Sequence, residues 1–325
     1  MAIGHNQTIL QKATTTAADL QPDGVLLPEQ EDELFKDIIK TSELLSQISV
    51  KTMTRREWQR HFMSFGTGQT LMAEEENTAL GEGDLASPVF RKVSMAAAYF
   101  KAEFIVTYQT LAEVVGNKEG FMRLVRENLP EKVTADLVDI LVNGDTSLPA
   151  TTQKNRARRQ LNGFLKKATS HIYDAESNLL TQALADDRHF GDAGHLQMPV
   201  QYRKRAGMSV LVPSNVYTLY KGQRGARMTP GGDAALEAAN APPHSGRPIV
   251  EEPFLPDDLG SDSDLGQCIQ TWPENMLVGM FRGTTIQLQE DIRRGHAILV
   301  VRVAADCTYN VPDGVVRYDN VKAKV

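Results

Sequence analysis

The chain has 325 residues, of which 41% are hydrophobic and 23% charged, and its formal net charge is −6 at pH 7. These values are typical of a globular protein with one large domain or two ordinary ones. The negative charge argues against a protein that grips nucleic acid with a basic face, but it is compatible with a lining that encloses nucleic acid without holding it.

The N-terminal part of the chain changes character near residue 30. Residues 1–30 are rich in Thr, Gln, Ala and Asp and contain too few apolar side chains to fold alone. Composition leaves two interpretations open, a disordered tail or an arm that becomes ordered on a neighbouring subunit. Residues 31–47 carry apolar side chains at helical spacing and predict a short amphipathic helix. Residues 48–54 alternate as a strand.

Residues 55–91 lack the periodicity of a packed core and combine glycines, charges and isolated aromatic side chains. So long a stretch without regular structure is unusual inside a compact domain. It is either a disordered surface loop or a long hairpin that lies across the next subunit, because exposed aromatic side chains are typical of interfaces. The chain then returns as a strand over residues 92–108. The candidate contact residues of this stretch are Trp58, Phe62, Phe65, Glu74, Glu75 and Arg91.

A long helix is predicted over residues 110–143, where apolar side chains recur every four residues. Pro130 interrupts the series, so it kinks the helix or begins a second one. Asn143 and Gly144 supply the C-cap. The recurring apolar residues are Phe121, Val125, Leu129, Val133, Leu137 and Leu141.

The next segment contains the main basic cluster of the chain. A run of positive charge is more typical of a solvated face than of a phosphate contact, and no aromatic side chains are interleaved here to stack on bases. The cluster consists of Lys154, Arg156, Arg158, Arg159, Lys166 and Lys167.

Residues 174–184 are predicted to form a helix that is capped by its first residue, Asp174. A buried strand at 209–213 precedes a helix at 214–220. Residues 222–247 are predicted to be a loop. Two further candidate contact residues lie in this loop, Arg224 and Arg227.

The C-terminal part of the chain reads as three strands and their turns. Residues 276–281 are apolar, and residues 284–289 alternate between apolar and polar side chains. Residues 297–307 form a long strand whose odd positions are all apolar. Its even positions become polar towards Asp306, so that one face is buried and the other meets water. A proline-glycine turn follows at 312–314.

No catalytic, cofactor-binding or metal-binding residues are predicted, because no nucleophile elbow, zinc-protease, Walker or dinucleotide sequence is present. His189 and His195 lie near several aspartates, but their spacing matches no compact ligand set. A soluble metal-dependent enzyme using these two histidines is kept as a remote alternative. Cys268 and Cys307 are far apart, which argues against a disulfide scaffold and favours a reducing compartment. There is no signal-peptide pattern and no apolar run of roughly 20 residues.

The order and spacing of these pieces resemble the major capsid proteins of tailed double-stranded DNA bacteriophages with the Hong Kong 97 fold. The likeness extends over roughly residues 30–321. It is carried by the strand-proline-helix unit S-V-L-V-P-S-N-V-Y-T-L-Y at 209–220 and by the C-terminal strands. The matching C-terminal pieces are Leu277-Val278-Gly279, the polar strand 284–289, the long strand 297–306 with Arg302, and the turn and last strand at 311–316.

The resemblance implies an α+β fold. It has an N-terminal arm, an extended β-hairpin loop, a peripheral domain with a long spine helix, and an axial domain whose central β-sheet is flanked by helices. The implied boundaries are 1–47 for the arm, 48–107 for the extended loop hairpin, 108–150 for the peripheral domain, 151–305 for the axial domain and 306–325 for the return to the peripheral domain.

The resemblance also implies a function, that of a major head protein which self-assembles into the icosahedral shell around the phage genome. The protein is then no enzyme and needs no cofactor or membrane. Its partners are pentamers and hexamers of itself, a separate scaffolding protein, a portal and, left open, a decoration protein. It encloses double-stranded DNA without sequence-specific binding, in a virion assembled in the host cytoplasm. An encapsulin-type compartment shell is the alternative. The lysine, asparagine and glutamate of the family's covalent crosslink have no match here, so no crosslink is predicted.

Overall fold

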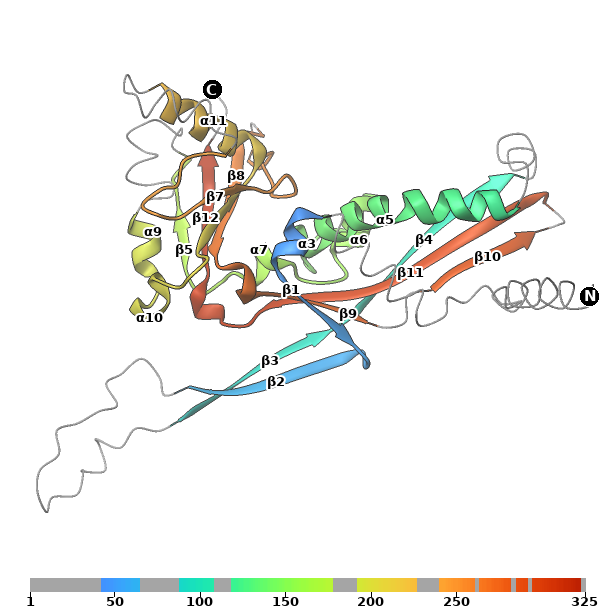
Figure 1. The fold of residues 1–325 in the computed structure, drawn as a ribbon, viewed down its shortest axis with the longest axis horizontal. Coiled ribbons are helices and arrows are strands. Elements are labelled where there is room, and N and C mark those ends of the chain that lie inside the picture. Colours follow the sequence, from blue (N-terminus) through green and yellow to red (C-terminus); the bar gives the residue numbers. More distant parts are fainter. Residues whose placement is uncertain are drawn as a thin grey trace, which may run out of the picture.

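The structure, a computed structural model, places two β-sheets, one long helix and a projecting hairpin (Figure 1). It describes residues 42–64, 88–107, 118–177, 192–226, 240–260, 263–281, 285–291 and 294–322. Within these ranges the first sheet contains β1, β4, β9, β10 and β11, the second contains β5, β12, β8, β6 and β7, and the hairpin consists of β2 and β3.

The first sheet is built on β11 (His296–Tyr309), a strand of 14 residues. On one side it pairs with β4 (Ala98–Thr107). On the other side it pairs first with β10 (Thr285–Asp291) and then with β9 (Met276–Phe281), both antiparallel. Strand β1 (Ser49–Met53) lies parallel to β9. One long strand therefore joins four others, because its two ends take different partners.

The apolar face predicted for β11 is confirmed where the structure describes it, since its odd positions are almost fully buried. The C-terminal half of α5 (Lys118–Asn143) packs on this part of the sheet, and Figure 1 shows the helix running along it. The short helix α3 (Glu43–Gln47), capped by Ser42, adds Leu44 and Leu45 to the same core. The buried odd positions of β11 are Leu299, Val301, Val303, Ala305 and Cys307.

The second sheet stands beside the first and has its own core. Its strand order is β5 (Ile172–Asp174), β12 (Val316–Lys322), β8 (Leu265–Thr271), β6 (Ser209–Val212) and β7 (Ile249–Glu251). Helix α11 (Ser214–Gly225) buries Val216 and Tyr220 against it. The predicted unit of buried strand, proline and helix is therefore present, because β6 is buried at every position and α11 follows Pro213.

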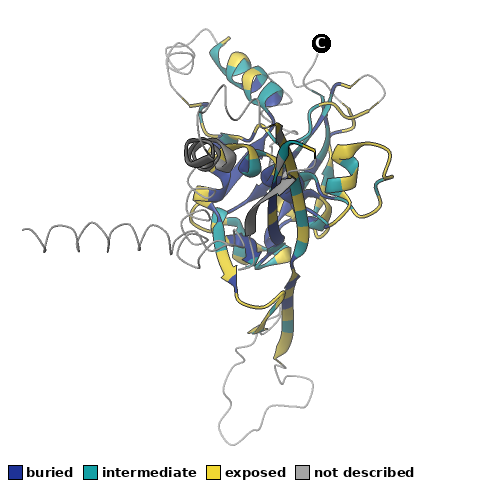
Figure 2. Ribbon diagram, turned by 90° about the vertical axis from the view of Figure 1, so that its right-hand side faces the viewer, coloured by how far each residue is buried: buried dark blue, intermediate teal, exposed yellow. Residues whose placement is uncertain are grey.

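Short helices and turns complete the description. Helices α6 (Gln153–Arg158) and α7 (Phe164–Lys167) follow α5, and α9 (Asp192–Gln197) and α10 (Val200–Arg203) lie beside the β5 side of the second sheet. Two short 3-10 turns, η3 (Pro273–Asn275) and η4 (Pro312–Gly314), connect the two sheets. The hairpin strands β2 (Glu57–Ser64) and β3 (Val89–Ala96) pair along their whole length and point away from both sheets (Figures 1 and 2).

Pro130 neither ends α5 nor begins a second helix, since the helix continues through it for 26 residues. A proline removes only one backbone donor. The C-terminal half of the helix is held by the burial of Leu137, Val138 and Leu141, each 3% exposed or less. Tertiary packing therefore outweighs the local cost of the proline.

The single returning strand predicted over 92–108 is two strands. Ala97 is fully buried between β3 and β4, and its backbone N–H donates to the carbonyl of Arg56 at 3.0 Å. The chain changes partner at this residue, from β2 on one side to β11 on the other. The alternation continues across the break, so the sequence pattern contains no sign of it.

Two predictions in the middle of the chain are also corrected. Asp174 is the last residue of β5 and its Oδ1 accepts the N–H of Glu176 at 2.8 Å, while Glu176 and Ser177 have positive φ values that do not begin a helix. The rest of that predicted helix lies outside the described residues. Helix α11 continues to Gly225, so the predicted loop begins later than residue 222.

The boundary at residue 305 does not separate the two sheets, because it falls inside β11. Strands β9, β10 and β11 belong with β1 and β4, whereas β12 pairs with β5 and β8 in the second sheet. Likewise β1 and β4, placed in the extended hairpin at 48–107, are members of the first sheet. Backbone pairing between distant segments, rather than local pattern, decides these memberships.

Candidate subunit-contact surfaces

The hairpin has two different faces. Its inner face carries Trp58 opposite Met95, and Met95 and Val93 are buried at the base. Its outer face is polar and exposed for most of its length. At the far end of the described strands this outer face becomes apolar, because Met63 and Phe90 form a cross-strand pair that is 52% and 73% exposed. Figure 2 shows the hairpin extending away from the buried core.

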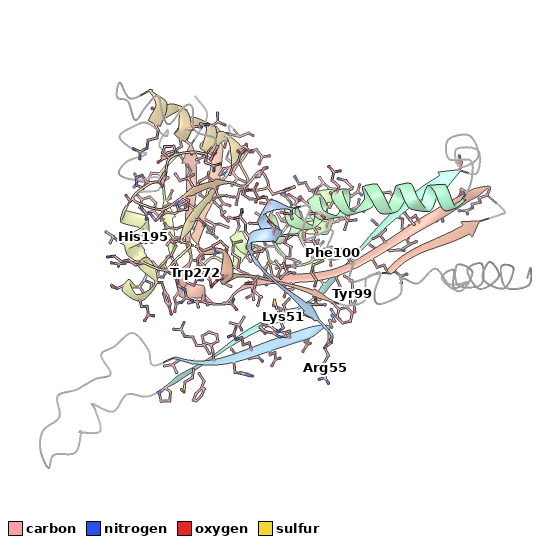
Figure 3. The ribbon with its side chains drawn as sticks, viewed as in Figure 1. Lys51, Arg55, Tyr99, Phe100, His195 and Trp272 are labelled. Atoms are coloured by element: carbon pink, nitrogen blue, oxygen red, sulfur yellow. The ribbon has the colours of Figure 1, made fainter. Side chains whose placement is uncertain are left out.

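A pocket of apolar side chains seats the base of the hairpin on the first sheet. Met53 from β1 and Met95 from β3 are each 2% exposed and lie against the face of β9 that carries Leu277. Gly279 makes this contact possible, because a Cβ atom there would lie 2.9 Å from Met53 Sδ and 3.1 Å from Met95 Cε. Trp58 packs on the rim of the pocket, with Lys51 Nζ 5.2 Å from its ring centroid. Figure 3 shows Lys51 and Tyr99 in this region.

Asp306 is the polar anchor of the hairpin base. Its Oδ2 accepts the backbone N–H of Ala96 at 2.8 Å, and its Oδ1 accepts Lys167 Nζ at 2.9 Å. Lys167 also donates to the carbonyl of Cys307. A single carboxylate thus joins β3, β11 and α7. Asp306 is only 6% exposed, so the prediction that this position faces water is wrong.

A second ion pair links the hairpin to the turn before β12. Arg91 on β3 pairs with Asp313 in η4, and both side chains are about one third exposed or more. Hydrogen bonding and the charge of Asp313 raise the pKa of Arg91. Because exposed pairs of this kind contribute little to stability, we interpret this one as orienting the hairpin rather than holding the fold together.

The predicted contact residues are distributed over several places. Trp58, Phe62 and Arg91 lie on the hairpin strands, half-buried on its inner face. Arg224 lies on α11, where its Nε donates to Tyr220 Oη at 3.0 Å and its Nη2 is 3.0 Å from His244 Nδ1. The other predicted contact residues, Phe65, Glu74, Glu75 and Arg227, lie outside the described residues. The exposed pair Met63 and Phe90 was missed because only the strand register places the two side by side.

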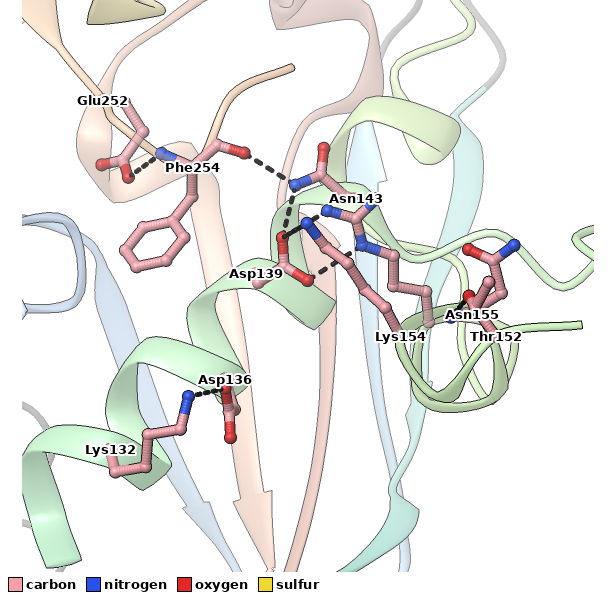
Figure 4. A network of polar contacts seen from close by, with 10 residues as sticks. Lys132, Asp136, Asp139, Asn143, Thr152, Lys154, Asn155, Glu252 and Phe254 are labelled. Carbon is pink, nitrogen blue, oxygen red and sulfur yellow. Dashed lines mark hydrogen bonds and ion pairs between the residues drawn. The ribbon is translucent and has the colours of Figure 1, made fainter. Parts of the chain in front are cut away.

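The basic cluster is engaged within the subunit (Figure 4). Arg158 Nε donates to Asp139 Oδ2 of α5 at 2.9 Å, and Lys154 Nζ lies 3.9 Å from Asp139 Oδ1. Asn143, one turn further along α5, donates to Asp139 and to the carbonyl of Phe254 at 2.7 Å. This network ties the end of the long helix to α6 and to the segment that follows β7.

The titratable groups singled out in the sequence do not form a metal site in the part of the chain that is described. His195 on α9 has its Nδ1 2.7 Å from Gln270 Nε2, and His189 lies outside that part. Cys268 and Cys307 are free, fully buried thiols, so Cys307 is a core residue as predicted. Burial raises the pKa of both thiols, that of Cys307 to about 12. None of the described helices has the length and apolar character needed to cross a membrane.

Comparison with known proteins gives one curated relative over the full length, while no protein-family model matches the chain. The relative is the "Putative prophage capsid protein YqbE" of Bacillus subtilis (strain 168). It is 27% identical over 322 residues, which cover 98% of this chain and 99% of the relative. The two chains therefore correspond from end to end rather than in one shared segment.

Solved structures resemble this one at low sequence identity. A chain of the satellite phage P4 procapsid that includes the size determination (Sid) protein matches with a TM-score of 0.60 and 14% identity, over 90% of this chain and 99% of that one. A chain of the SrpI encapsulin complex from Synechococcus elongatus PCC 7942 matches with a TM-score of 0.53 and 10% identity, over 87% and 88%. At such identities the likeness concerns the fold. The recognition made from the sequence is confirmed: the chain has the Hong Kong 97-like α+β fold of tailed-phage major capsid proteins.

Proposed function

We propose that this protein is a major capsid protein, whose copies assemble into the icosahedral shell around a phage or prophage genome. The observation that carries the proposal is the projecting hairpin, which displays Met63 and Phe90 to solvent at its far end. A subunit that works alone gains nothing from an exposed apolar pair at this position, whereas a neighbouring copy can cover it. The end-to-end match to a relative named as a prophage capsid protein supports the same conclusion.

In this proposal each structural part has a place in the shell. The second sheet with α11 is the axial domain, the first sheet with α5 is the peripheral domain, and β2 and β3 are the base of the extended loop. The role is mechanical rather than catalytic. Each contact is weak, but closure of a symmetric shell makes many contacts act together. The net charge of −6 suits a shell that encloses double-stranded DNA without reading its sequence.

The contacts and partners beyond the shell are part of the proposal. Rings of five and six copies meet through the extended loop and the axial loops, with Trp58, Phe62 and Arg91 at the hairpin base. A separate scaffolding protein and a portal take part in assembly in the host cytoplasm, and the finished protein resides in the virion. The remaining contact residues are Phe65, Glu74, Glu75, Arg224 and Arg227.

An encapsulin-type compartment is the weaker alternative. Its support is the shared fold alone, whereas the phage reading also has a curated relative that spans the chain. The two predict different contents. Shells purified from cells that also carry the phage packaging genes contain nuclease-protected DNA in the phage reading and a cargo protein in the alternative.

Size-exclusion chromatography with light scattering, followed by negative-stain imaging, tests the proposal. The wild-type chain, with scaffolding protein supplied, is expected to form closed shells or rings of five or six. A variant in which residues 65–87 are replaced by an Asn-Gly turn keeps both strands of the hairpin and is expected to remain a folded monomer. A wild-type monomer at every concentration would overturn the proposal, and so would shells formed by the shortened variant.

A further inference from the structure

The second sheet has two lateral edges of different composition, at opposite ends of its strand order. At one end lie β5, α9 and α10, and at the other lie β7 and the segment that reaches α3 and the end of α5 (Figure 1). This inference rests on the proposed function. In a ring of rotated copies every subunit presents one surface to the neighbour on one side and a different surface to the neighbour on the other.

The first of these surfaces, here called the basic edge, consists of Leu196, Val200, Lys204 and Arg205. Leu196 is 54% exposed and Val200 is 76% exposed, although both are apolar. Lys204 and Arg205 are exposed as well and form no ion pair with any described residue. The edge therefore offers positive charge beside apolar surface, which is the composition of an interface rather than of a free surface.

The basic edge is rigid. Arg203 donates through Nε to the carbonyl of Met198 at 2.7 Å and also to the carbonyl of Leu196, which fixes the turn between α9 and α10. Arg205 lies over the ring of Trp272, 4.9 Å from its centroid, and Tyr202 stacks on the same ring. Figure 3 shows the position of Trp272 in this part of the molecule. Because the side chains are held in advance, docking here costs little conformational entropy.

The second surface, the acidic edge, consists of Glu43, Glu251 and Glu252. Glu43 opens α3, Glu251 ends β7, and both are exposed. Glu252 is only 6% exposed, yet its single hydrogen bond is a long one, 3.4 Å from the N–H of Phe254 (Figure 4). Burial raises the pKa of Glu252 to about 7, and the charges of Glu43 and Glu251 raise it further in the same direction.

The acidic edge lacks a cation of its own. Within the described ranges none of the three carboxylates forms an ion pair. The described carboxylates here also form no group of three that is able to hold a metal ion. Like charges placed together, one of them largely buried, are unfavourable until a positive group approaches. A long lysine or arginine side chain from outside the subunit meets this need, since it reaches several carboxylates without requiring a coordination geometry.

We propose that the basic edge of one copy docks on the acidic edge of the next copy in the ring. Lys204 and Arg205 of one subunit then neutralise Glu43, Glu251 and Glu252 of its neighbour, while Leu196 and Val200 are buried beside them. The two edges lie on opposite sides of the same sheet, so the contact repeats around a ring without using either surface twice. Charge complementarity also fixes the order of assembly, because two basic or two acidic edges repel each other.

Charge reversal of the two edges tests this pairing. The variant K204E/R205E makes both edges acidic, and E43K/E251K makes both basic. Each is expected to form shells at least about tenfold less efficiently than the wild type under identical conditions. The quadruple variant, with both edges reversed, is expected to assemble to within about twofold of the wild type. All four positions are exposed, so each variant is expected to fold, as circular dichroism and thermal melting of the unassembled subunit will verify.

Mixing the two double variants provides an independent readout. Each is compatible only with the other, so they alternate around a ring. Rings of six are then expected, and rings of five, which cannot alternate, are expected to be absent. The matched control is R156E/R159E on α6, which changes the net charge as K204E/R205E does; the substitutions E43K/E251K are expected not to rescue it.

The outcomes separate this pairing from the proposed function. If the wild type forms shells and K204E/R205E forms them equally well, the pairing is overturned while the capsid function stands. Failure of the quadruple variant to recover, with its fold intact, also overturns the pairing. If the wild type forms no shells or rings under any condition, the capsid function is overturned and the pairing with it.

Discussion

Asp306 accepts the backbone N–H of Ala96 at 2.8 Å although 210 residues separate the two in the chain. The other oxygen of the same carboxylate accepts Lys167 Nζ at 2.9 Å. The last residue of the hairpin is therefore fixed to the long central strand through one buried charge. A backbone donor has no rotamers, so this bond sets the direction in which the hairpin leaves the sheet.

Replacing Asp306 by Asn is expected to lower the free energy of unfolding of the unassembled subunit by about 2–4 kcal/mol, because it leaves the ammonium group of Lys167 without its partner. Urea unfolding followed by circular dichroism measures this loss. The double variant D306N/K167M is expected to lose less than D306N. Asp136→Asn, which breaks the exposed pair with Lys132, is the control and is expected to cost less than about 0.5 kcal/mol. An equal loss in D306N and the control would contradict the assignment of Asp306 as the anchor.

Gly279→Leu is expected to destabilise the subunit by about 3 kcal/mol, because the new side chain occupies the space of Met53 and Met95. Gly279→Ala is expected to cost only about 1 kcal/mol, since both methionine ends are flexible. Thermal unfolding of the two variants measures the difference. Gly222→Ala on α11 is the control, as nothing lies within 4 Å of its added Cβ, and it is expected to be neutral or slightly stabilising. Equal melting temperatures for G279L and G279A would argue against a tightly filled pocket.

The parts of the fold that local patterns specify were predicted well from the sequence. The apolar strand at 276–281 and the unit at 209–220 were placed correctly, because hydrophobic period and proline position are local properties. The break at Ala97 was not predicted, since the strands on its two sides keep one alternation and differ only in their partners. Pairing partners more than 200 residues away leave no trace in a local pattern.

The candidate contact surface was predicted only in outline. Trp58 and Phe62 do lie on a projecting hairpin, but the exposed pair Met63 and Phe90 depends on strand register, which the sequence does not reveal. Asp306 was assigned to water because a carboxylate in an alternating strand usually faces solvent. Its burial depends on Lys167, a residue that a local pattern places only in a basic cluster. Charge on a strand therefore needs a search for a distant partner before it is read as exposure.

Glu252 makes stability depend on pH in the unassembled subunit. Its pKa is raised from 4.5 to about 7 on folding, so the folded state holds the proton more tightly than the unfolded state. Stability is therefore expected to fall as pH rises from about 4.5 to about 7. Glu252→Gln, which resembles the protonated form, is expected to stabilise the subunit by about 1–3 kcal/mol at pH 8 and to have little effect at pH 4.5.

Urea titrations of wild type and E252Q at the two pH values measure this difference. Glu251→Gln is the control, because its side chain is exposed and its removal relieves only part of the repulsion. A gain of equal size at both pH values would show that the substitution acts through packing rather than through charge.

Neither cysteine is expected to react with a thiol reagent in the native protein at pH 8. Cys268 and Cys307 are fully buried, and burial raises the pKa of Cys307 to about 12, so almost no thiolate is present. The colour yield with a disulfide reagent measures this directly. Both thiols are expected to react once the protein is unfolded in denaturant. Rapid labelling of either one under native conditions would contradict its place in the core.

The long separation between pairing partners has a consequence for synthesis of the chain. Ser49 pairs with Leu277, and Arg91 contacts Asp313, which lies 222 residues later. The hairpin and β1 therefore leave the ribosome well before β9 and β11 exist, and their apolar faces stay uncovered during that time. Closing loops of this length is also slow. A nascent chain that stops before β11 has no central strand to join, so premature termination leaves an aggregation-prone fragment rather than a smaller subunit.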